Sequence, residues 1–219
     1  MKRSIQNSIS GIRTEYISDG LDEKDVSADP LILFEEWMKE AEEKIPETPN
    51  ATFLATVGTG GKPSGRIVLL RGFDERGFVF FTNYESRKGV ELRKNNNASM
   101  TFFWNKLFRQ VRIEGRVFKL PEEESDQYFS SRPRESHIAA LVSEQSRKLE
   151  SRAFLEERLR EIEKRYEDKP IPRPHNWGGY YLSPFSMEFW QGREFRLHDR
   201  ILYHRNDHKG DWKIERLYP

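Results

Sequence analysis

Residues 51–82 read ATFLATVGTGGKPSGRIVLLRGFDERGFVFFT, and this stretch decides the fold class. Its β-prone runs at 51–57, 66–71 and 78–82 are separated by turn-forming residues at 58–65 and 73–77. Short strands joined by such turns form hairpins, in which neighbouring strands run antiparallel. The stretch therefore predicts the beginning of an antiparallel sheet.

The rest of the chain adds helices and more short strands. Asp29 and Pro30 are typical of a helix start, and the apolar spacing after them predicts a helix that ends near Pro46. Further helices are expected at 86–95, after Pro121, around 138–142 and at 151–168, and further strands at 99–104, 109–120, 180–190, 196–205 and 212–217. Antiparallel pairs with helices inserted between them predict an α+β barrel and not a doubly wound parallel sheet. We expect one domain at residues 29–219, preceded by a mobile N-terminal arm at residues 1–28.

Composition excludes several classes of protein. The chain has 219 residues, a formal charge of +1 and no cysteine, so disulfides, thiolate metal sites and cysteine nucleophiles are ruled out. No apolar run is longer than five residues, which is too short for a membrane helix, and the charge run at 151–168 is typical of a solvated helix face and not of a nucleic-acid site. His204 and His208 fit a surface hairpin better than a metal site. We expect a reducing, cytoplasmic setting, with no metal, membrane or nucleic-acid partner.

Two groups of residues are suited to binding phosphate. Arg87 and Lys88 follow Ser86 where a strand gives way to a helix, so two cations and free backbone N–H groups would converge there. A charged helix start at the surface explains the same residues without any ligand. Tyr128, Arg132, Arg134 and Ser136 supply a phenol, two guanidiniums and a hydroxyl within nine residues.

A third candidate is the predicted strand at 196–205. Its alternation would place Arg196, His198 and Arg200 on one face, a surface suited to an electron-rich, anionic ligand. Trp190 would lie nearby across a hairpin, although it suits the core equally well. An ordinary exposed strand explains this pattern as well as a site does.

Taken together, ten short motifs resemble the pyridoxine/pyridoxamine 5'-phosphate oxidase family. They are 66–71 (RIVLLR), 80–83 (FFTN), 86–88 (SRK), 109–111 (RQV), 128–129 (YF), 131–133 (SRP), 145–146 (QS), 177–179 (WGG), 188–192 (EFWQG) and 196–200 (RLHDR). The resemblance runs from about Arg13 to Pro219. It implies an FMN-binding split β-barrel with peripheral helices, which works as a homodimer with FMN between the subunits.

The resemblance also implies residue roles. FMN would be bound by Arg66, Ile67, Val68, Leu69, Leu70, Arg71, Phe81, Thr82, Arg87, Lys88, Gln110, Gln145, Ser146, Trp190 and Arg200, with Arg87 and Lys88 on its phosphate. The substrate phosphate would be bound by Arg71, Tyr128, Arg132 and Ser136. Arg196 and His198 would act as the catalytic pair over the pyridine ring, and Arg13 and Tyr16 would close over it from the N-terminal arm.

The chemistry implied is oxidation of pyridoxamine 5'-phosphate or pyridoxine 5'-phosphate to pyridoxal 5'-phosphate, with O2 as acceptor and H2O2 released. The family usually has Lys, Gln, Gly and Ser where this chain has Arg71, His137, Ala139 and Arg147. Two other readings stay open. One is a non-catalytic flavin or pyridoxal-phosphate carrier of the same fold, and the other is an FMN-binding split-barrel reductase that acts on another substrate.

Overall fold

The computed structural model describes residue 16, residue 18, residues 20–206 and residues 210–219. The part of the predicted arm at residues 1–15, 17 and 19 lies outside the described residues, and so do Arg13 and His208. Residues 20–28 contact the C-terminal strands, where the Leu21 amide donates to Asp199 Oδ2 at 3.0 Å and Arg216 pairs with Glu23 at 2.6 Å.

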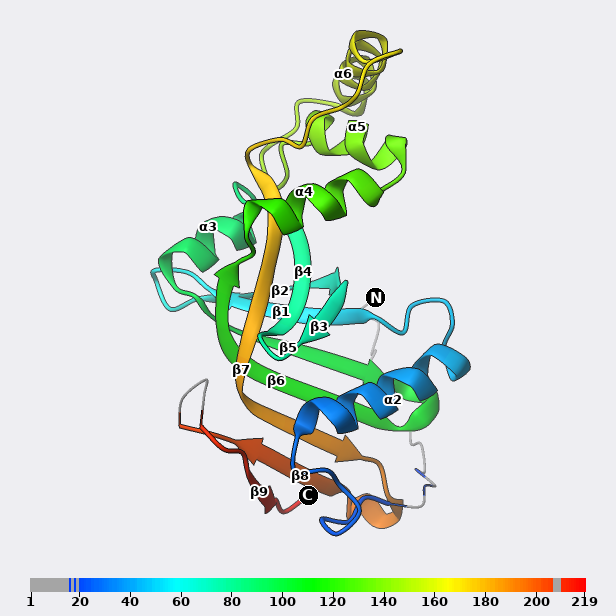
Figure 1. Cartoon of the computed structure of the whole chain (residues 1–219), viewed down its shortest axis with the longest axis vertical. Coiled ribbons are helices and arrows are strands. Elements are labelled where there is room, and N and C mark those ends of the chain that lie inside the picture. Colours follow the sequence, from blue (N-terminus) through cyan, green and yellow to red (C-terminus); the bar gives the residue numbers. More distant parts are fainter. Residues whose placement is uncertain (1–15, 17, 19, 207–209) are drawn as a thin grey trace, which may run out of the picture.

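The strands of the described residues form one curled antiparallel sheet (Figure 1). They are β1 (Ala51–Val57), β2 (Pro63–Leu69), β3 (Gly72–Asp74), β4 (Gly77–Asn83), β5 (Asn97–Trp104), β6 (Arg109–Lys119), β7 (Trp177–Gln191), β8 (Asp199–His204) and β9 (Lys213–Arg216). The order is β2-β1-β5-β6-β7-β4-β3, and β8 pairs with β7 and β9. The predicted α+β split barrel is confirmed.

Helix α2 (Pro30–Lys44) closes the core against the sheet. Asp29 caps it by accepting a hydrogen bond from the Leu31 amide at 2.9 Å, as the Asp-Pro pair predicted. Its buried face carries Phe34, whose ring lies 4.9 Å from that of Phe78 and 5.2 Å from that of Phe102. One helix therefore joins the two halves of the curled sheet through aromatic contacts.

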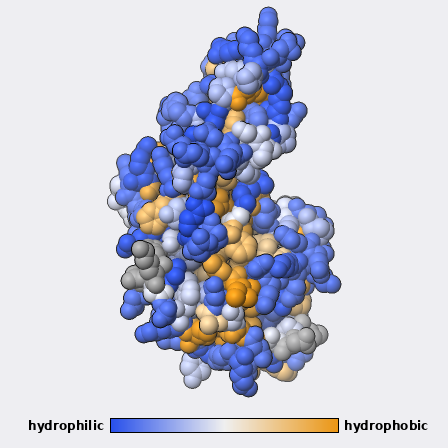
Figure 2. All heavy atoms as spheres, in the orientation of Figure 1, coloured by the Kyte–Doolittle hydropathy of each residue, from blue (hydrophilic) through white to orange (hydrophobic). Residues whose placement is uncertain are grey.

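The remaining helices lie away from α2. They are α3 (Arg87–Lys94), α4 (Glu122–Ser131), α5 (Arg134–Val142) and α6 (Arg152–Arg165). Figure 1 shows α4, α5 and α6 stacked beyond one end of β4 and β7, and Figure 2 shows a mostly hydrophilic surface over them in that view. No residue of α6 is buried, in agreement with the solvated helix face that its charges predicted. In the part of the chain that the structure describes, no helix is both long and apolar enough to cross a membrane.

The predicted strand at 196–205 is wrong in its first three residues. β8 begins at Asp199, and Glu194–Arg196 form a 3₁₀ turn in which the Leu197 amide donates to Glu194 O. Phe195 and Arg196 have φ values of 56° and 62°. The chain must reverse here from β7 into β8, and a left-handed pair achieves that reversal where an extended strand cannot. Arg196, His198 and Arg200 therefore do not share one face of a strand.

Candidate functional site

A cleft of about 660 Å³ lies between the sheet and the helices α3 to α5. Its walls come from segments that are far apart in the sequence: β2, β4, the start of α3, α4, the end of α5 and the following loop. The lining residues are Ser64, Gly65, Arg66, Ile67, Val68, Leu69, Arg71, Phe81, Thr82, Asn83, Arg87, Lys88, Tyr128, Arg132, Ala139, Ala140, Ser143, Gln145, Ser146 and Trp177.

The start of α3 forms one wall of the cleft. Ser86 caps this helix by accepting from the Gly89 amide at 3.3 Å, which places Arg87 and Lys88 in the first turn. Gly89 allows this helix start to pack closely, because a Cβ there would lie 2.3 Å from the carbonyl oxygen of Tyr84. The positive end of the helix and both cations therefore face the same space.

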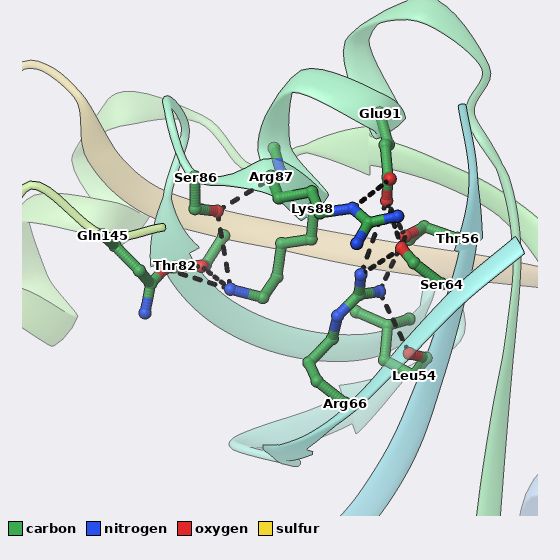
Figure 3. Close-up of polar contacts among 11 residues, drawn as sticks. Leu54, Thr56, Ser64, Arg66, Thr82, Ser86, Arg87, Lys88, Glu91 and Gln145 are labelled. Carbon is green, nitrogen blue, oxygen red and sulfur yellow. Dashed lines mark hydrogen bonds and ion pairs between the residues drawn. The ribbon is translucent and has the colours of Figure 1, made fainter. Parts of the chain in front are cut away.

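Lys88 is a buried cation, only 8% exposed. Its Nζ donates to Thr82 Oγ1 and Gln145 Oε1, both at 3.0 Å, and lies 3.4 Å from Ser86 Oγ (Figure 3). Burial, with a smaller effect of the Arg66 charge, lowers the pKa of Lys88 to about 8. All three partners are neutral, and within the described residues no carboxylate pairs with this ammonium. The site is therefore electrostatically prepared for an anion.

Arg66 and Arg87 meet on the other side of Lys88 at the carboxylate of Glu91 (Figure 3). Arg87 Nε donates to Glu91 Oε1 at 2.9 Å, and Arg66 Nη2 lies 3.4 Å from Glu91 Oε2. The sequence analysis missed Glu91 and also Ser64, which contacts both Arg66 and Glu91. The i,i+4 spacing of Arg87 and Glu91 was a signal for the pair, but not for its burial.

A second cationic group lies on α4 and the chain around it. The Arg132 guanidinium stands 4.6 Å from the centre of the Trp177 ring, and its Nη1 is buried with no hydrogen-bond partner in the described part of the chain. Burial lowers the pKa of Arg132, and the nearby Arg71 charge lowers it further although Tyr128 opposes this. Arg71 itself lies 6.0 Å from the centre of the Tyr128 ring. An unpartnered buried donor between aromatic rings is costly unless a ligand accepts from it.

A third group lies outside the cleft. Gln110, Trp190 and Arg200 are directly paired across β6, β7 and β8. The Trp190 ring lies 4.7 Å from the His198 ring and 5.7 Å from the Tyr16 ring. His198 Nδ1 accepts from the Arg193 amide at 3.1 Å, and burial followed by the Arg196 charge lowers the pKa of His198. Its imidazole is therefore favoured in the neutral form.

The structure thus sorts the predicted residues into two places. The predicted residues that line the cleft are Arg66, Ile67, Val68, Leu69, Arg71, Phe81, Thr82, Arg87, Lys88, Tyr128, Arg132, Gln145 and Ser146. Tyr16, Gln110, Trp190, Arg196, His198 and Arg200 do not line it, and neither does Ser136, in the first turn of α5. Leu70 is 5% exposed and belongs to the core.

Comparisons with known proteins identify the family to which the chain belongs. Residues 38–166 match the family model for pyridoxamine 5'-phosphate oxidase, and residues 177–219 match that for the pyridoxine 5'-phosphate oxidase C-terminal dimerisation region. A pyridoxine/pyridoxamine 5'-phosphate oxidase of Burkholderia mallei is 56% identical over 96% of this chain and 99% of the relative. One from Burkholderia thailandensis is 55% identical over the same shares.

Solved structures extend the comparison. PhzG from Burkholderia lata, in complex with tetrahydrophenazine-1-carboxylic acid, has a TM-score of 0.85 and 33% identity, covering 92% of this chain and 98% of PhzG. A pyridoxamine 5'-phosphate oxidase-related, FMN-binding protein of Nostoc punctiforme has a TM-score of 0.70 at 19% identity over 89% of this chain and 100% of its own, which shows the fold alone. With two family models covering most of its length and relatives above 50% identity, the chain belongs to the pyridoxamine 5'-phosphate oxidase family.

Proposed function

We propose that the protein is an FMN-dependent oxidase that converts pyridoxamine 5'-phosphate or pyridoxine 5'-phosphate to pyridoxal 5'-phosphate in the cytoplasm. Family membership supports the reaction class. One observation carries the assignment: the cleft holds two distinct cationic groups. Burial lowers the pKa of Arg66 and that of Lys88, and a neighbouring cation adds to each effect, Arg87 for Arg66 and Arg66 for Lys88. Separately, burial and the Arg71 charge lower the pKa of Arg132 beside Tyr128. Two anion sites in one cleft suit two phosphate monoesters, one on FMN and one on the substrate.

The residues present fit FMN. The buried Lys88 ammonium, whose partners are all neutral, and the positive end of α3 suit its phosphate. β2 is the last strand in the sheet order, so the backbone along residues 66–69 has one edge free of strand pairing within the described residues. Such an edge offers N–H and C=O groups to a planar heterocycle with polar edges. Phe81, Thr82, Gln145 and Ser146 would complete that wall.

When bound, FMN supplies the acceptor for a hydride and the route by which the two electrons reach O2. The balanced reactions are R–CH2NH2 + O2 + H2O → R–CHO + NH3 + H2O2 and R–CH2OH + O2 → R–CHO + H2O2. The protein's part is to bind and orient. Arg71, Tyr128 and Arg132 would hold the substrate phosphate, whereas the role expected for Ser136, which does not line the cleft, stays a prediction.

We infer that Gln110, Trp190, Arg196, His198 and Arg200 reach the cleft from a second copy of the chain. The match of residues 177–219 to a dimerisation region supports this. The face of the sheet between the two places is also unusually apolar for a surface: Phe53, Ile67 and Phe103 are 46%, 63% and 58% exposed. Phe53 pairs with Ile67 across β1 and β2, and Phe103 pairs with Gln110 across β5 and β6, so this face connects the cleft strand to the third group. Tyr16 would close over the substrate from the same side.

A second candidate function follows from the likeness to PhzG. The Arg132 Nη1, which has no hydrogen-bond partner in the described part of the chain, could donate to a carboxylate as well as to a phosphate, and PhzG was solved with tetrahydrophenazine-1-carboxylic acid. The non-catalytic carrier is the third possibility.

One experiment separates these functions. The purified protein, loaded with FMN, is given pyridoxamine 5'-phosphate, pyridoxine 5'-phosphate, unphosphorylated pyridoxamine or a tetrahydrophenazine carboxylic acid, and H2O2 release and O2 uptake are recorded. We expect equal amounts of O2 consumed and H2O2 formed with the phosphorylated vitamers, and a kcat/KM at least about 100-fold lower with pyridoxamine because the phosphate contacts are lost. Turnover of the phenazine alone would establish the PhzG-like function, and no turnover with bound flavin would establish a carrier.

A further inference from the structure

Glu91 lies in the second turn of α3, behind the wall of the cleft. It is only 9% exposed and is not among the lining residues, whereas its neighbours Ser64, Arg66 and Arg87 all are. Burying a carboxylate is unfavourable unless donors surround it. Its position therefore calls for a reason beyond the packing of α3.

The carboxylate is anchored to the sheet through one oxygen. Glu91 Oε2 accepts from Thr56 Oγ1 and from Ser64 Oγ, both at 2.6 Å, and lies 3.4 Å from Arg66 Nη2 (Figure 3). Burial alone would raise the pKa of Glu91, but the hydrogen bonds from Ser64, Thr56 and Arg87 outweigh it and bring the pKa to about 2. The group is therefore a fixed negative charge at every pH at which the protein works.

The other oxygen holds Arg87. Glu91 Oε1 accepts from Arg87 Nε at 2.9 Å, while the Arg87 side chain is 63% exposed. A guanidinium whose Nε is engaged has its two terminal nitrogens left at the opposite end, and these can grip two oxygens of one phosphate. Arg66 differs, because both of its terminal nitrogens already donate to Leu54 O, Thr56 Oγ1 or Ser64 Oγ. Of these two arginines, Arg87 is the one whose terminal nitrogens have no hydrogen-bond partner among the described residues, and Glu91 sets their direction.

We propose that Glu91 is a positioning residue: anchored to β1 and β2, it orients Arg87 so that its terminal nitrogens meet the phosphate of FMN. This rests on the proposed function, which supplies FMN as the ligand. A negative charge this close to a phosphate weakens the attraction of the site for an anion. The arrangement therefore favours FMN binding only if orienting an exposed arginine adds more binding free energy than this repulsion removes.

The test compares FMN with riboflavin, which has the same ring system and no phosphate. Dissociation constants for both are measured by flavin fluorescence on the full-length apoprotein for wild type, Glu91→Gln, Glu91→Ala, Arg87→Ala and the two double variants. Glutamine keeps the volume and can still accept from Thr56 and Ser64, but its amide cannot satisfy both anchors and Arg87. Glu156→Gln is the matched control, because Glu156 forms the same i,i+4 pair with Arg152 on α6, away from the cleft.

We expect Glu91→Gln to weaken FMN binding at least fivefold and Glu91→Ala at least tenfold, with the riboflavin constant unchanged within twofold. In the Arg87→Ala background both effects should shrink below twofold, a coupling that a general packing role would not produce. Glu156→Gln should match wild type. Melting temperatures identify any variant that does not fold, and if Glu91→Ala is one, Glu91→Gln decides.

Three results would overturn the proposal: tighter FMN binding by Glu91→Gln, an equal loss for riboflavin, or an undiminished effect in the Arg87→Ala background. Failure of the proposed function looks different. It would be seen in the wild-type protein as the same affinity for FMN and riboflavin, before any variant is compared.

Discussion

Replacing Lys88 with methionine should make the apoprotein more stable and its FMN binding weaker. Burial lowers the pKa of Lys88 from its ordinary value of 10.5 to about 8, and each pH unit between the two corresponds to about 1.4 kcal/mol, so the buried charge costs the fold about 3 kcal/mol. The two 3.0 Å hydrogen bonds to Thr82 and Gln145 stabilise the folded protein by about 1 kcal/mol each. Methionine has a similar length and no charge, which leaves a net gain of about 1 kcal/mol in the free energy of unfolding.

The pH dependence provides an independent check on the same reasoning. Because the folded-state pKa lies below the unfolded-state value, the cost is fully present below pH 8 and is relieved as the pH rises from about 8 toward 10.5, so the wild-type apoprotein should gain stability over that range. FMN binding should show the opposite trend, about tenfold weaker at pH 9 than at pH 7, because the ammonium must be protonated to bind a phosphate. Lys88→Met should lose both trends and bind FMN about 10- to 100-fold more weakly than wild type at pH 7.

Urea unfolding of the apoprotein and fluorescence titration with FMN, each between pH 7 and 10, measure these quantities. Lys88→Gln is the companion variant, since it keeps a donor for Thr82 and Gln145 without the charge. A Lys88→Met apoprotein that is less stable than wild type and binds FMN equally well would refute this reasoning. It would show that the buried Lys88 charge neither destabilises the apoprotein nor contributes to anion binding.

Three further predictions concern other parts of the molecule. Arg71→Ala should raise KM for the phosphorylated substrate by about 30-fold, equivalent to about 2 kcal/mol of binding free energy, with kcat little changed. Arg71→Lys should weaken substrate binding by about 1 kcal/mol or less. An unchanged KM in Arg71→Ala would show that Arg71 is not part of the phosphate site. Arg196→Ala should keep its flavin, seen as the yellow colour after purification, and lose most turnover, since its expected partner is the substrate ring; a colourless protein would contradict that role. Phe34→Ala should lower the free energy of unfolding by about 3–5 kcal/mol in urea, because the fully buried ring joins both halves of the sheet; a loss below about 1 kcal/mol would show that α2 is not central to the core.

Much of the fold could be predicted from local sequence, because its signals act over a few residues. Asp29 caps α2 and Ser86 caps α3 by bonding to amides two or three positions away, so the starts of both helices could be predicted from sequence. The hairpins in residues 51–82 follow from turn residues between β-prone runs, and β1 and β2 pair in register from Ala51–Leu69 to Val57–Pro63. The same locality explains the error at Arg196, where the chain reversal between β7 and β8 overrides the alternating pattern.

The tertiary structure alone decided which charges are paired. Sequence placed Arg87 and Lys88 side by side at a helix start, with Glu91 four residues after Arg87, but only the packing of α3 against β1 and β2 brings Glu91 to Thr56, Ser64 and Arg66. The tertiary contacts likewise leave Lys88 with Thr82, Ser86 and Gln145 and with no carboxylate partner in the described part of the chain. Likewise, the division of the predicted residues between the cleft and the β6-β7-β8 group follows from strand order, which places β2 at one end of the sheet path and β8 beyond β7. Desolvation and ion pairing depend on contacts between segments up to 113 residues apart, from Ser64 to Trp177 in one cleft, and no local pattern encodes those distances.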